Sequence, residues 1–253
     1  MNLLAFDTST EIMSIAVQRT VTDTGEHARV PRIWQHSAPG GAQTSAHLIP
    51  GIERLMTQAQ LTFNELDAIV FGNGPGSFTG LRTACAVAQG LALGANLKVL
   101  PIGTLLAVAE EARHQQAPTQ EHYRVLALLD ARMDEMYAAC YEFNRGHWHP
   151  LLDACLIQPE SLVWDDACTL AGNVFAAYGA RLPAPPPDAL ASSSAGALAP
   201  RVEVLPGAGA LLRLAPALLA SGAAVRAEHA LPHYIRDKVA KTTLERAAEQ
   251  LVR

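Results

Sequence analysis

The chain alternates between two hydrophobic periods, and this alternation predicts a mixed α/β protein. Short apolar runs bounded by turn residues indicate strands, whereas apolar residues that recur every three or four positions indicate helices. In the first hundred residues the expected strands are 3–7, 12–18, 31–37, 66–72 and 96–103. The expected helices are 44–60, with Thr44 as its N-cap, and 79–93, which Gly94 ends. Hairpin strands followed by alternating helices and strands predict a mixed sheet with helices packed against it.

After residue 103 the pattern starts again, which indicates a second, similar lobe. The expected elements there are a helix at 104–115, strands at 124–132, 135–143 and 151–158 with a tight turn at Met133 and Asp134, a short buried strand at 168–173 and an apolar helix at 210–222. Pro216 is expected to kink or divide the last helix. Residues 182–200 hold five prolines and three consecutive serines, a composition typical of an exposed loop. The tail from Thr242 predicts a weak terminal helix.

These patterns divide the chain into an N-terminal lobe over 1–103, a C-terminal lobe over 104–225 and a C-terminal segment over 226–253.

Composition narrows the class of protein. Hydrophobic residues make up 49% and charged residues 17% of the chain, which is typical of a globular protein. The formal net charge is −5 and Lys and Arg form no run, so a broad nucleic-acid surface is not expected. The N-terminus has no basic region before its short apolar run, and no segment is apolar for about 18 residues. We therefore expect a cytoplasmic protein with no membrane partner, whose four cysteines are small core residues in a reducing compartment.

The glycine-rich segment GNGPGSFTGLR (72–82) follows a predicted strand and opens a predicted helix. Such a turn aims free backbone N–H groups at a ligand over the start of the helix. The candidate nucleotide-binding residues in and near it are Asp7, Thr8, Gly74, Gly76, Ser77, Thr79 and Arg82. Its spacing nevertheless fits neither the Walker A nor the dinucleotide pattern. The alternatives are that the glycines only form a tight turn and that Asp7 forms an Asx-type turn.

Three further features give weaker signals. Ser77 does not lie in a G-x-S-x-G elbow and no His/Asp order supports a triad, so a peptidase is the least supported function. Neither His229 with His233 nor His147 with His149 predicts a metal site, because Pro232 interrupts the first pair and an exposed turn better explains the second. Asp130 and Arg132 are expected to form an internal ion pair or a turn hydrogen bond.

Four segments together resemble the bacterial TsaB (YeaZ) family of tRNA threonylcarbamoyladenosine biosynthesis. They are LLAFDTSTEIMSIAV at the start, GNGPGSFTGLR with its helix, LLDARMDEMYAACY in the second lobe and LPHYIRDKVA near the end. The chain departs from the family pattern at Ala84, where glycine is common, at Gln89, where lysine is common, and at 44–46, where His-Ser-Glu is often found.

The resemblance implies an actin/Hsp70/sugar-kinase-like α/β fold of two similar lobes, each a mixed sheet with flanking helices. It also implies a partner, the TsaD-like transferase, which uses a metal to add threonylcarbamoyl to the adenosine 3′-adjacent to the anticodon of ANN-decoding tRNAs. That partner carries an H-x-x-x-H metal pair, but the corresponding segment here, 104–116, has no such pair. We therefore expect a non-catalytic accessory subunit without a metal of its own.

The resemblance also carries expectations about partners and ligands. The ATPase subunit of the same complex is a second partner, ATP or ADP lies at the interface with the partner, tRNA is met only through the complex, and a homodimer is an alternative. The expected docking face lies on the helices 44–60 and 79–93, at Leu48, Ile52, Met56, Ala84, Val87, Ala88 and Leu91. The alternative is that both helices simply cover their own sheet. The rival function is an independent ATP-using transferase or kinase of the same fold.

Overall fold

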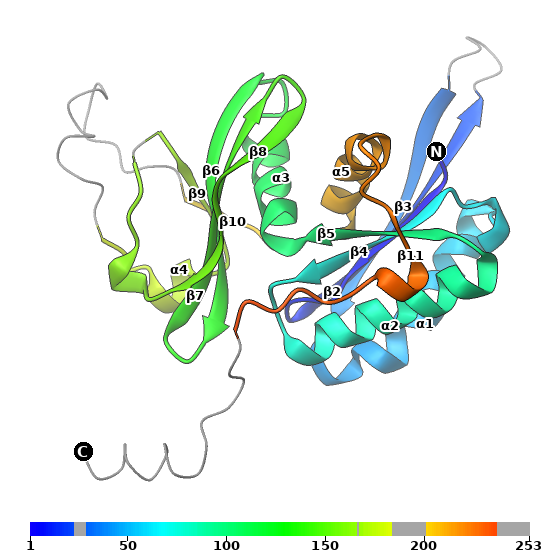
Figure 1. Cartoon of the computed structure of the whole chain (residues 1–253), viewed down its shortest axis with the longest axis horizontal. Helices are drawn as coiled ribbons and strands as arrows, with labels where there is room; N and C mark the ends of the chain where they lie inside the picture. The colour runs from blue at the N-terminus through cyan, green and yellow to red at the C-terminus, as the bar shows by residue number, and fades with distance from the viewer. Residues whose placement is uncertain (23–28, 166, 184–200, 237–253) are drawn as a thin grey trace, which may run out of the picture.

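The computed structural model describes residues 1–22, 29–165, 167–183 and 201–236, and Figure 1 shows them as two sheets with helices on and between them. The first sheet has the order β11-β5-β4-β1-β2-β3 and the second the order β10-β9-β6-β7-β8. In each sheet, three antiparallel strands continue into two strands that run parallel to the first of the three. The predicted fold class, two similar lobes with mixed sheets, is therefore confirmed.

Successive side chains of each strand in the first sheet point to opposite faces of the sheet, and helices cover both faces. Its strands are β1 (Leu3–Asp7), β2 (Ile12–Thr22), β3 (Arg29–Pro39), β4 (Ala68–Gly74), β5 (Lys98–Gly103) and β11 (Val225–Arg226). Leu4 and Phe6 of β1 point toward α1 (Thr44–Ala59) and α2 (Phe78–Ala95), which cover one face. Leu3 and Ala5 point toward α5 (Ala208–Ala220), which covers the other.

The second sheet also has a helix on each face, but one of the two helices is only one turn long. Its strands are β6 (His122–Arg132), β7 (Glu135–Asn144), β8 (His147–Ile157), β9 (Thr169–Gly172) and β10 (Arg201–Glu203). Helix α3 (Thr104–Gln116) packs on one face, and α4 (Phe175–Tyr178) lies on the other side. Single turns of 3-10 helix complete the described elements at Gly41–Gln43, Phe63–Glu65, Pro159–Ser161 and Ala227–His229.

Helices α3 and α5 lie between the two sheets and contact each other (Figure 1). Helix α5 falls within the range expected from sequence for the second lobe, and β11 spans the boundary between that lobe and the C-terminal segment, yet α5 packs on β1, β2 and β4, and β11 pairs with β5. The chain therefore returns to the first sheet after β10. Within the described residues, no helix combines the length and apolar character needed to cross a membrane.

Four local predictions differ from the structure in detail. Gln43, not Thr44, precedes α1 as its N-cap, because a 3-10 turn leads directly into the helix. Helix α2 ends at Ala95, one residue past Gly94, and Asn96 rather than glycine supplies the left-handed C-cap, with φ of 53° that asparagine tolerates. The exposed Pro216 does not divide helix α5, so of the two expectations for it only the kink stays a prediction. Residues 147–149 begin strand β8 rather than forming a turn. The predicted terminal helix and most of the loop 182–200 lie outside the described residues.

Candidate functional site

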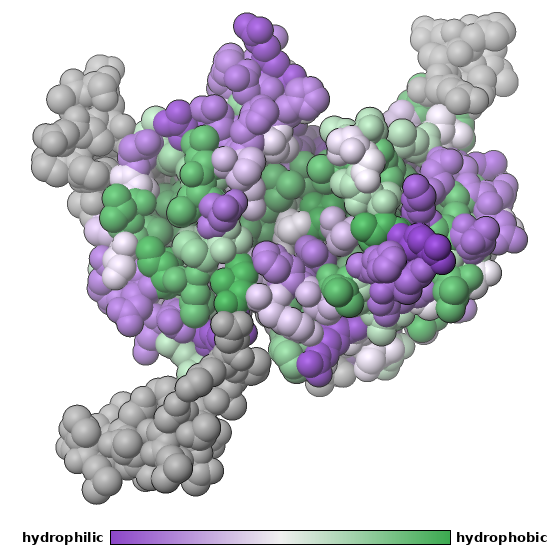
Figure 2. Space-filling model, in the orientation of Figure 1, coloured by the Kyte–Doolittle hydropathy of each residue, from purple (hydrophilic) through white to green (hydrophobic). Residues whose placement is uncertain are grey.

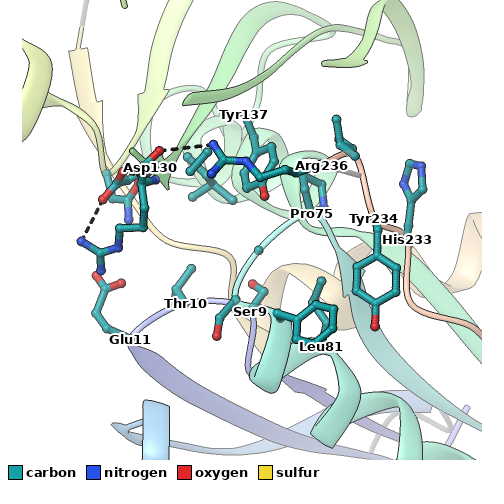
Figure 3. A pocket seen from close by; sticks show the side chains of 18 of the residues that line it. Ser9, Thr10, Glu11, Pro75, Leu81, Asp130, Tyr137, His233, Tyr234 and Arg236 are labelled. Atoms are coloured by element: carbon teal, nitrogen blue, oxygen red, sulfur yellow. Dashed lines mark hydrogen bonds and ion pairs between the residues drawn. The ribbon is translucent and has the colours of Figure 1, made fainter. Parts of the chain in front are cut away.

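A cavity of about 430 Å³ lies between the two lobes (Figure 3). The first lobe contributes the β1–β2 turn and the glycine loop, here residues 72–80, and the second contributes the β6–β7 turn. The C-terminal segment closes the wall with His233, Tyr234, Ile235 and Arg236. The cavity therefore has walls from both lobes and from the C-terminal segment.

The glycine loop packs against the β1–β2 turn at three points, where its backbone leaves no room for a side chain. A β-carbon on Gly72 would lie 1.7 Å from Asp7 Oδ2, one on Gly76 would lie 2.5 Å from the Ser9 carbonyl oxygen, and one on Gly80 would lie 1.9 Å from the Thr8 carbonyl oxygen. The contact is also hydrogen-bonded, since Ser77 N–H donates to the Ser9 carbonyl at 2.7 Å. The glycines are therefore required for close backbone approach.

Asp7 is enclosed by this packing. Its Oδ1 accepts hydrogen bonds from the Ser9 backbone N–H at 2.9 Å and from Ser9 Oγ at 2.6 Å, while Oδ2 has no partner among the described residues. Burial raises the pKa of Asp7 from 3.8 to about 6, although the two bonds from Ser9 act in the opposite direction. The Asx-turn alternative is confirmed, and the carboxylate does not line the cavity.

Few of the other candidate nucleotide-binding residues face the cavity. Gly76 and Ser77 line it, and Ser77 Oγ caps α2 by accepting from Gly80 N–H at 3.4 Å. Thr8 is buried and donates to the Gly80 carbonyl at 2.7 Å. A β-carbon on Gly74 would lie 2.3 Å from the His233 carbonyl, so the C-terminal segment covers this residue. Thr79 lies exposed on the first turn of α2, away from the cavity lining.

Arg82, the remaining candidate, is held outside the cavity by aromatic residues. Its guanidinium carbon lies 3.7 Å from the centre of the Phe78 ring, and its Nε donates to Tyr234 Oη at 3.0 Å. Phe78 and Tyr234 also contact each other, with 5.3 Å between ring centres. Arg82 therefore ties the C-terminal segment to α2.

On the second-lobe side of the cavity, the predicted contact between Asp130 and Arg132 is confirmed, and two further residues that the sequence did not indicate line the cavity. Asp130 pairs with Arg132 at 3.0 Å and accepts its backbone N–H at 2.8 Å, as expected. Tyr137 and Arg236 also line the cavity, and neither was predicted. The segment LPHYIR (231–236) carried the signal for Arg236, because it combines aromatic and cationic residues near the end of the described chain.

The predicted docking residues are, for the most part, part of the protein's own core. Leu48, Ile52, Met56, Ala84 and Ala88 are all buried, and Val87 and Leu91 are half-buried against the same cluster. Apolar positions of an amphipathic helix face the sheet beneath them, so a partner cannot reach these five in this conformation. The alternative, that the helices cover their own sheet, describes these five side chains, while docking that involves Val87 and Leu91 of the same helices stays a prediction.

The outer side of the same two helices has a different character. Leu93 is 76% exposed and Ile49 is 44% exposed. Ala86, Gly90 and Gly94 lie four residues apart on α2, all exposed, with open space over both glycines. In Figure 2 the region of α1 and α2 shows hydrophobic and hydrophilic residues side by side. We call Ile49, Ala86, Gly90, Leu93 and Gly94 the outer helical face.

The histidine pairs do not form a metal centre within the described residues. His229 ends a 3-10 turn and His233 follows in irregular backbone, while His147 and His149 lie exposed on β8. Among the residues the structure describes, no three His, Cys, Asp or Glu side chains come close enough to share a metal ion.

Comparison with known proteins gives consistent relatives over most of the chain. A family model described as "TsaD: tRNA N6-adenosine threonylcarbamoyltransferase" matches residues 35–244. The chain is 33% identical over 241 residues to the tRNA threonylcarbamoyladenosine biosynthesis protein TsaB of Escherichia coli (strain K12), covering 95% of this chain and 96% of that protein. A TsaB of Haemophilus influenzae is 39% identical over 54% of this chain and 52% of its own length. The solved structure "YeaZ from Pseudomonas aeruginosa" is 34% identical, with a TM-score of 0.75 over 92% of this chain and 99% of that chain.

Proposed function

We propose a function for this chain from its family: it belongs to the TsaB/YeaZ proteins of tRNA threonylcarbamoyladenosine biosynthesis. In this proposal the chain works in the cytoplasm as a non-catalytic subunit that docks on a TsaD-like transferase and activates it. The transferase supplies the metal and modifies the adenosine 3′-adjacent to the anticodon of ANN-decoding tRNAs. The net charge of −5 suits a subunit that meets tRNA only through the complex.

The outer helical face is the observation that carries the docking proposal. Small residues along one line of a helix let a second helix approach closely, because the side chains at the crossing set the distance between the axes. Ala86, Gly90 and Gly94 supply such a line, Leu93 supplies an exposed apolar side chain on the same helix, and Ile49 supplies one on α1. A surface of mixed polarity is also typical of subunits that exist both free and bound.

A substitution at Gly90 tests the docking proposal directly. Gly90→Arg adds a long charged side chain over open space, so the helix stays intact while the partner's approach is blocked. We expect binding to a purified TsaD-like partner, measured by titration calorimetry, to weaken by at least about tenfold, a loss of about 1.4 kcal/mol. Ala217→Arg places the same side chain at an exposed position of α5 and is the matched control. Equal affinity of Gly90→Arg and the unmodified chain would refute docking through this face.

The other partner and ligand expectations remain part of the proposal. The ATPase subunit of the complex binds the assembled pair, and ATP or ADP lies at the shared interface. A homodimer through the same outer helical face competes with the transferase, so sedimentation of Gly90→Arg should show less dimer if self-pairing occurs.

The rival function, an independent ATP-using transferase or kinase, needs an accessible carboxylate at Asp7 to hold metal and phosphate. The observed carboxylate is fully buried beneath the glycine loop, which favours the accessory role. Metal-dependent ATP hydrolysis by the purified chain alone, abolished in Asp7→Ala, would instead support the rival.

A further inference from the structure

Residues 230–236, which we call the strap, run from the first lobe toward the second (Figure 1), and residues 233–236 line the cavity between the lobes. At the first lobe the strap is fixed to α2 and the glycine loop. The Ala230 carbonyl accepts from Gln89 Nε2 at 2.8 Å and from Cys85 Sγ at 3.2 Å, and His233 N–H donates to the Asn73 carbonyl at 2.7 Å. Together with the Tyr234 contacts, these hydrogen bonds attach the first-lobe end of the strap to α2 and the glycine loop.

The second-lobe end depends on two residues. Ile235 packs against the apolar cluster under the β6–β7 turn. The Arg236 guanidinium pairs with the Glu135 carboxylate and donates to the Arg132 carbonyl at 3.3 Å, while Nη1 lies 3.0 Å from the Met133 sulfur. Figure 3 shows Arg236 reaching from the strap across the cavity wall toward the Asp130 side of the cleft.

The contact of Arg236 with the second lobe leaves one of its hydrogen-bond donors without an acceptor among the described residues. Arg236 is 13% exposed, and its Nε is buried without a partner among the described residues. A buried donor without an acceptor loses the hydration it would have in water and gains no bond in exchange. The second-lobe end is therefore the weaker of the two ends.

Away from the strap, the two lobes are connected through helices α3 and α5. The chain crosses between sheets from β5 into α3 and from β10 into α5, and these helices share a buried ionic contact. Glu110 of α3 accepts from Arg213 of α5 at 2.9 Å and from Trp148 of β8 at 3.1 Å. On the α3–α5 side the two lobes are joined by chain crossings and buried packing, as at a hinge. On the strap side they are joined by a polar contact that can break, as at a clasp.

We propose that the strap is a clasp that holds the cleft between the lobes closed, with Arg236 and Glu135 as the releasable contact. When this contact breaks, the lobes separate about the α3–α5 side, and the cavity lined by residues 233–236 opens. The strap stays attached to α2 throughout, because its first-lobe bonds are independent of Arg236.

The distance between the lobes, measured by pulsed electron paramagnetic resonance on the full chain, tests the clasp. Spin labels are attached through a ketone-bearing amino acid at Gln58 of α1 and Ala176 of α4, both exposed, so the four native cysteines are left untouched. Arg236→Ala and Glu135→Gln should each shift the distance distribution to longer values and broaden it. Exchanging the pair, with Glu135→Arg and Arg236→Glu together, should restore the original distribution.

Arg124→Ala is the matched control, because Arg124 pairs with Glu142 and Asp165 on the second lobe away from the cleft. It should leave the distribution unchanged. If Arg236→Ala does not fold, Glu135→Gln and the exchanged pair decide the question. Unchanged distances in the folded single variants, or equal lengthening in Arg124→Ala, would overturn the clasp.

Discussion

Three glycines of the glycine loop lie where a β-carbon would overlap the β1–β2 turn, and these contacts set what the loop can do. Gly72, Gly76 and Gly80 each face a different atom of the segment from Asp7 to Ser9. A loop pressed against its own hairpin has less backbone free for phosphate than an open P-loop. The two motifs, DTST and GNGPGSFTG, are therefore two halves of one packing contact.

Two glycine-to-alanine substitutions on α2 should change the stability of the fold in opposite directions. In Gly80→Ala the new β-carbon would lie 1.9 Å from the Thr8 carbonyl oxygen, which forces backbone apart at an expected cost of about 1–3 kcal/mol. Gly90→Ala faces open space in the same helix and should stabilise the fold by about 0.5–1 kcal/mol. Urea denaturation of both variants measures the difference, and equal stability would contradict the packing described.

The stability of the protein should carry a pH dependence from Asp7. Its folded-state pKa of about 6 exceeds the ordinary value of 3.8, so the folded protein holds the proton more tightly than the unfolded chain. Stability from this group is fully present below about pH 4 and is lost as pH rises through 6, by roughly 3 kcal/mol at about 1.4 kcal/mol per pKa unit.

Asp7→Asn tests this dependence, because the neutral amide can still accept from Ser9 and does not titrate. The free energy of unfolding should fall less steeply between pH 4 and pH 6.5 in the variant than in the unmodified chain. Identical slopes would show that the carboxyl group is not proton-binding in this window.

At the scale of elements, α3, α5 and β8 meet at the buried carboxylate of Glu110. It accepts from both Arg113 and Arg213 and from the indole of Trp148. Glu110→Gln removes the charge and leaves Arg113 without its carboxylate partner, while Arg213 keeps its pair with Glu111, so we expect a loss of about 1–3 kcal/mol, moderated by the partial exposure of the arginines.

Glu142→Gln removes one carboxylate from the more exposed pair with Arg124, where a loss of about 0–1 kcal/mol is expected. Chemical denaturation of both variants provides the comparison. A Glu110→Gln protein no less stable than Glu142→Gln would mean that the contact does not join these elements.

The sequence predicted those elements that carry several buried apolar residues, either in a continuous run or at helical spacing. Strand 3–7 and helices 44–60 and 104–115 match the structure to within a residue or two, because each carries several buried apolar positions. Strands β10 and β11 have only three and two residues, too few to show a period, and were not predicted. Their positions depend on pairing with β9 and β5, which is a tertiary effect.

The docking face shows why the site was harder to predict than the fold. Selecting apolar positions such as Leu48 and Ile52 finds the side of the helix that its own sheet covers. Gly90 and Gly94 contribute no hydrophobic signal, and only the structure shows that space above them is open. The strap residues were missed for a related reason, since no short-range pattern shows that Arg236 reaches Glu135, 101 positions earlier.

At the scale of the whole molecule, two similar lobes enclose a cleft, and the described contacts suit a subunit that works through a partner. The carboxylate expected to handle phosphate is buried, while helix α2 presents an exposed line of small residues. The similarity to TsaB of Escherichia coli spans 95% of the chain, so the proposed role concerns the molecule as a whole.

Reconstitution of the modification tests the accessory role most directly. Unmodified ANN-decoding tRNA, threonylcarbamoyl-adenylate and a purified TsaD-like transferase are combined with and without this chain, and the threonylcarbamoyladenosine formed is quantified. The account predicts strong stimulation by the unmodified chain and by Ala217→Arg, and none by Gly90→Arg. Full formation of the modified nucleoside without the chain would contradict it.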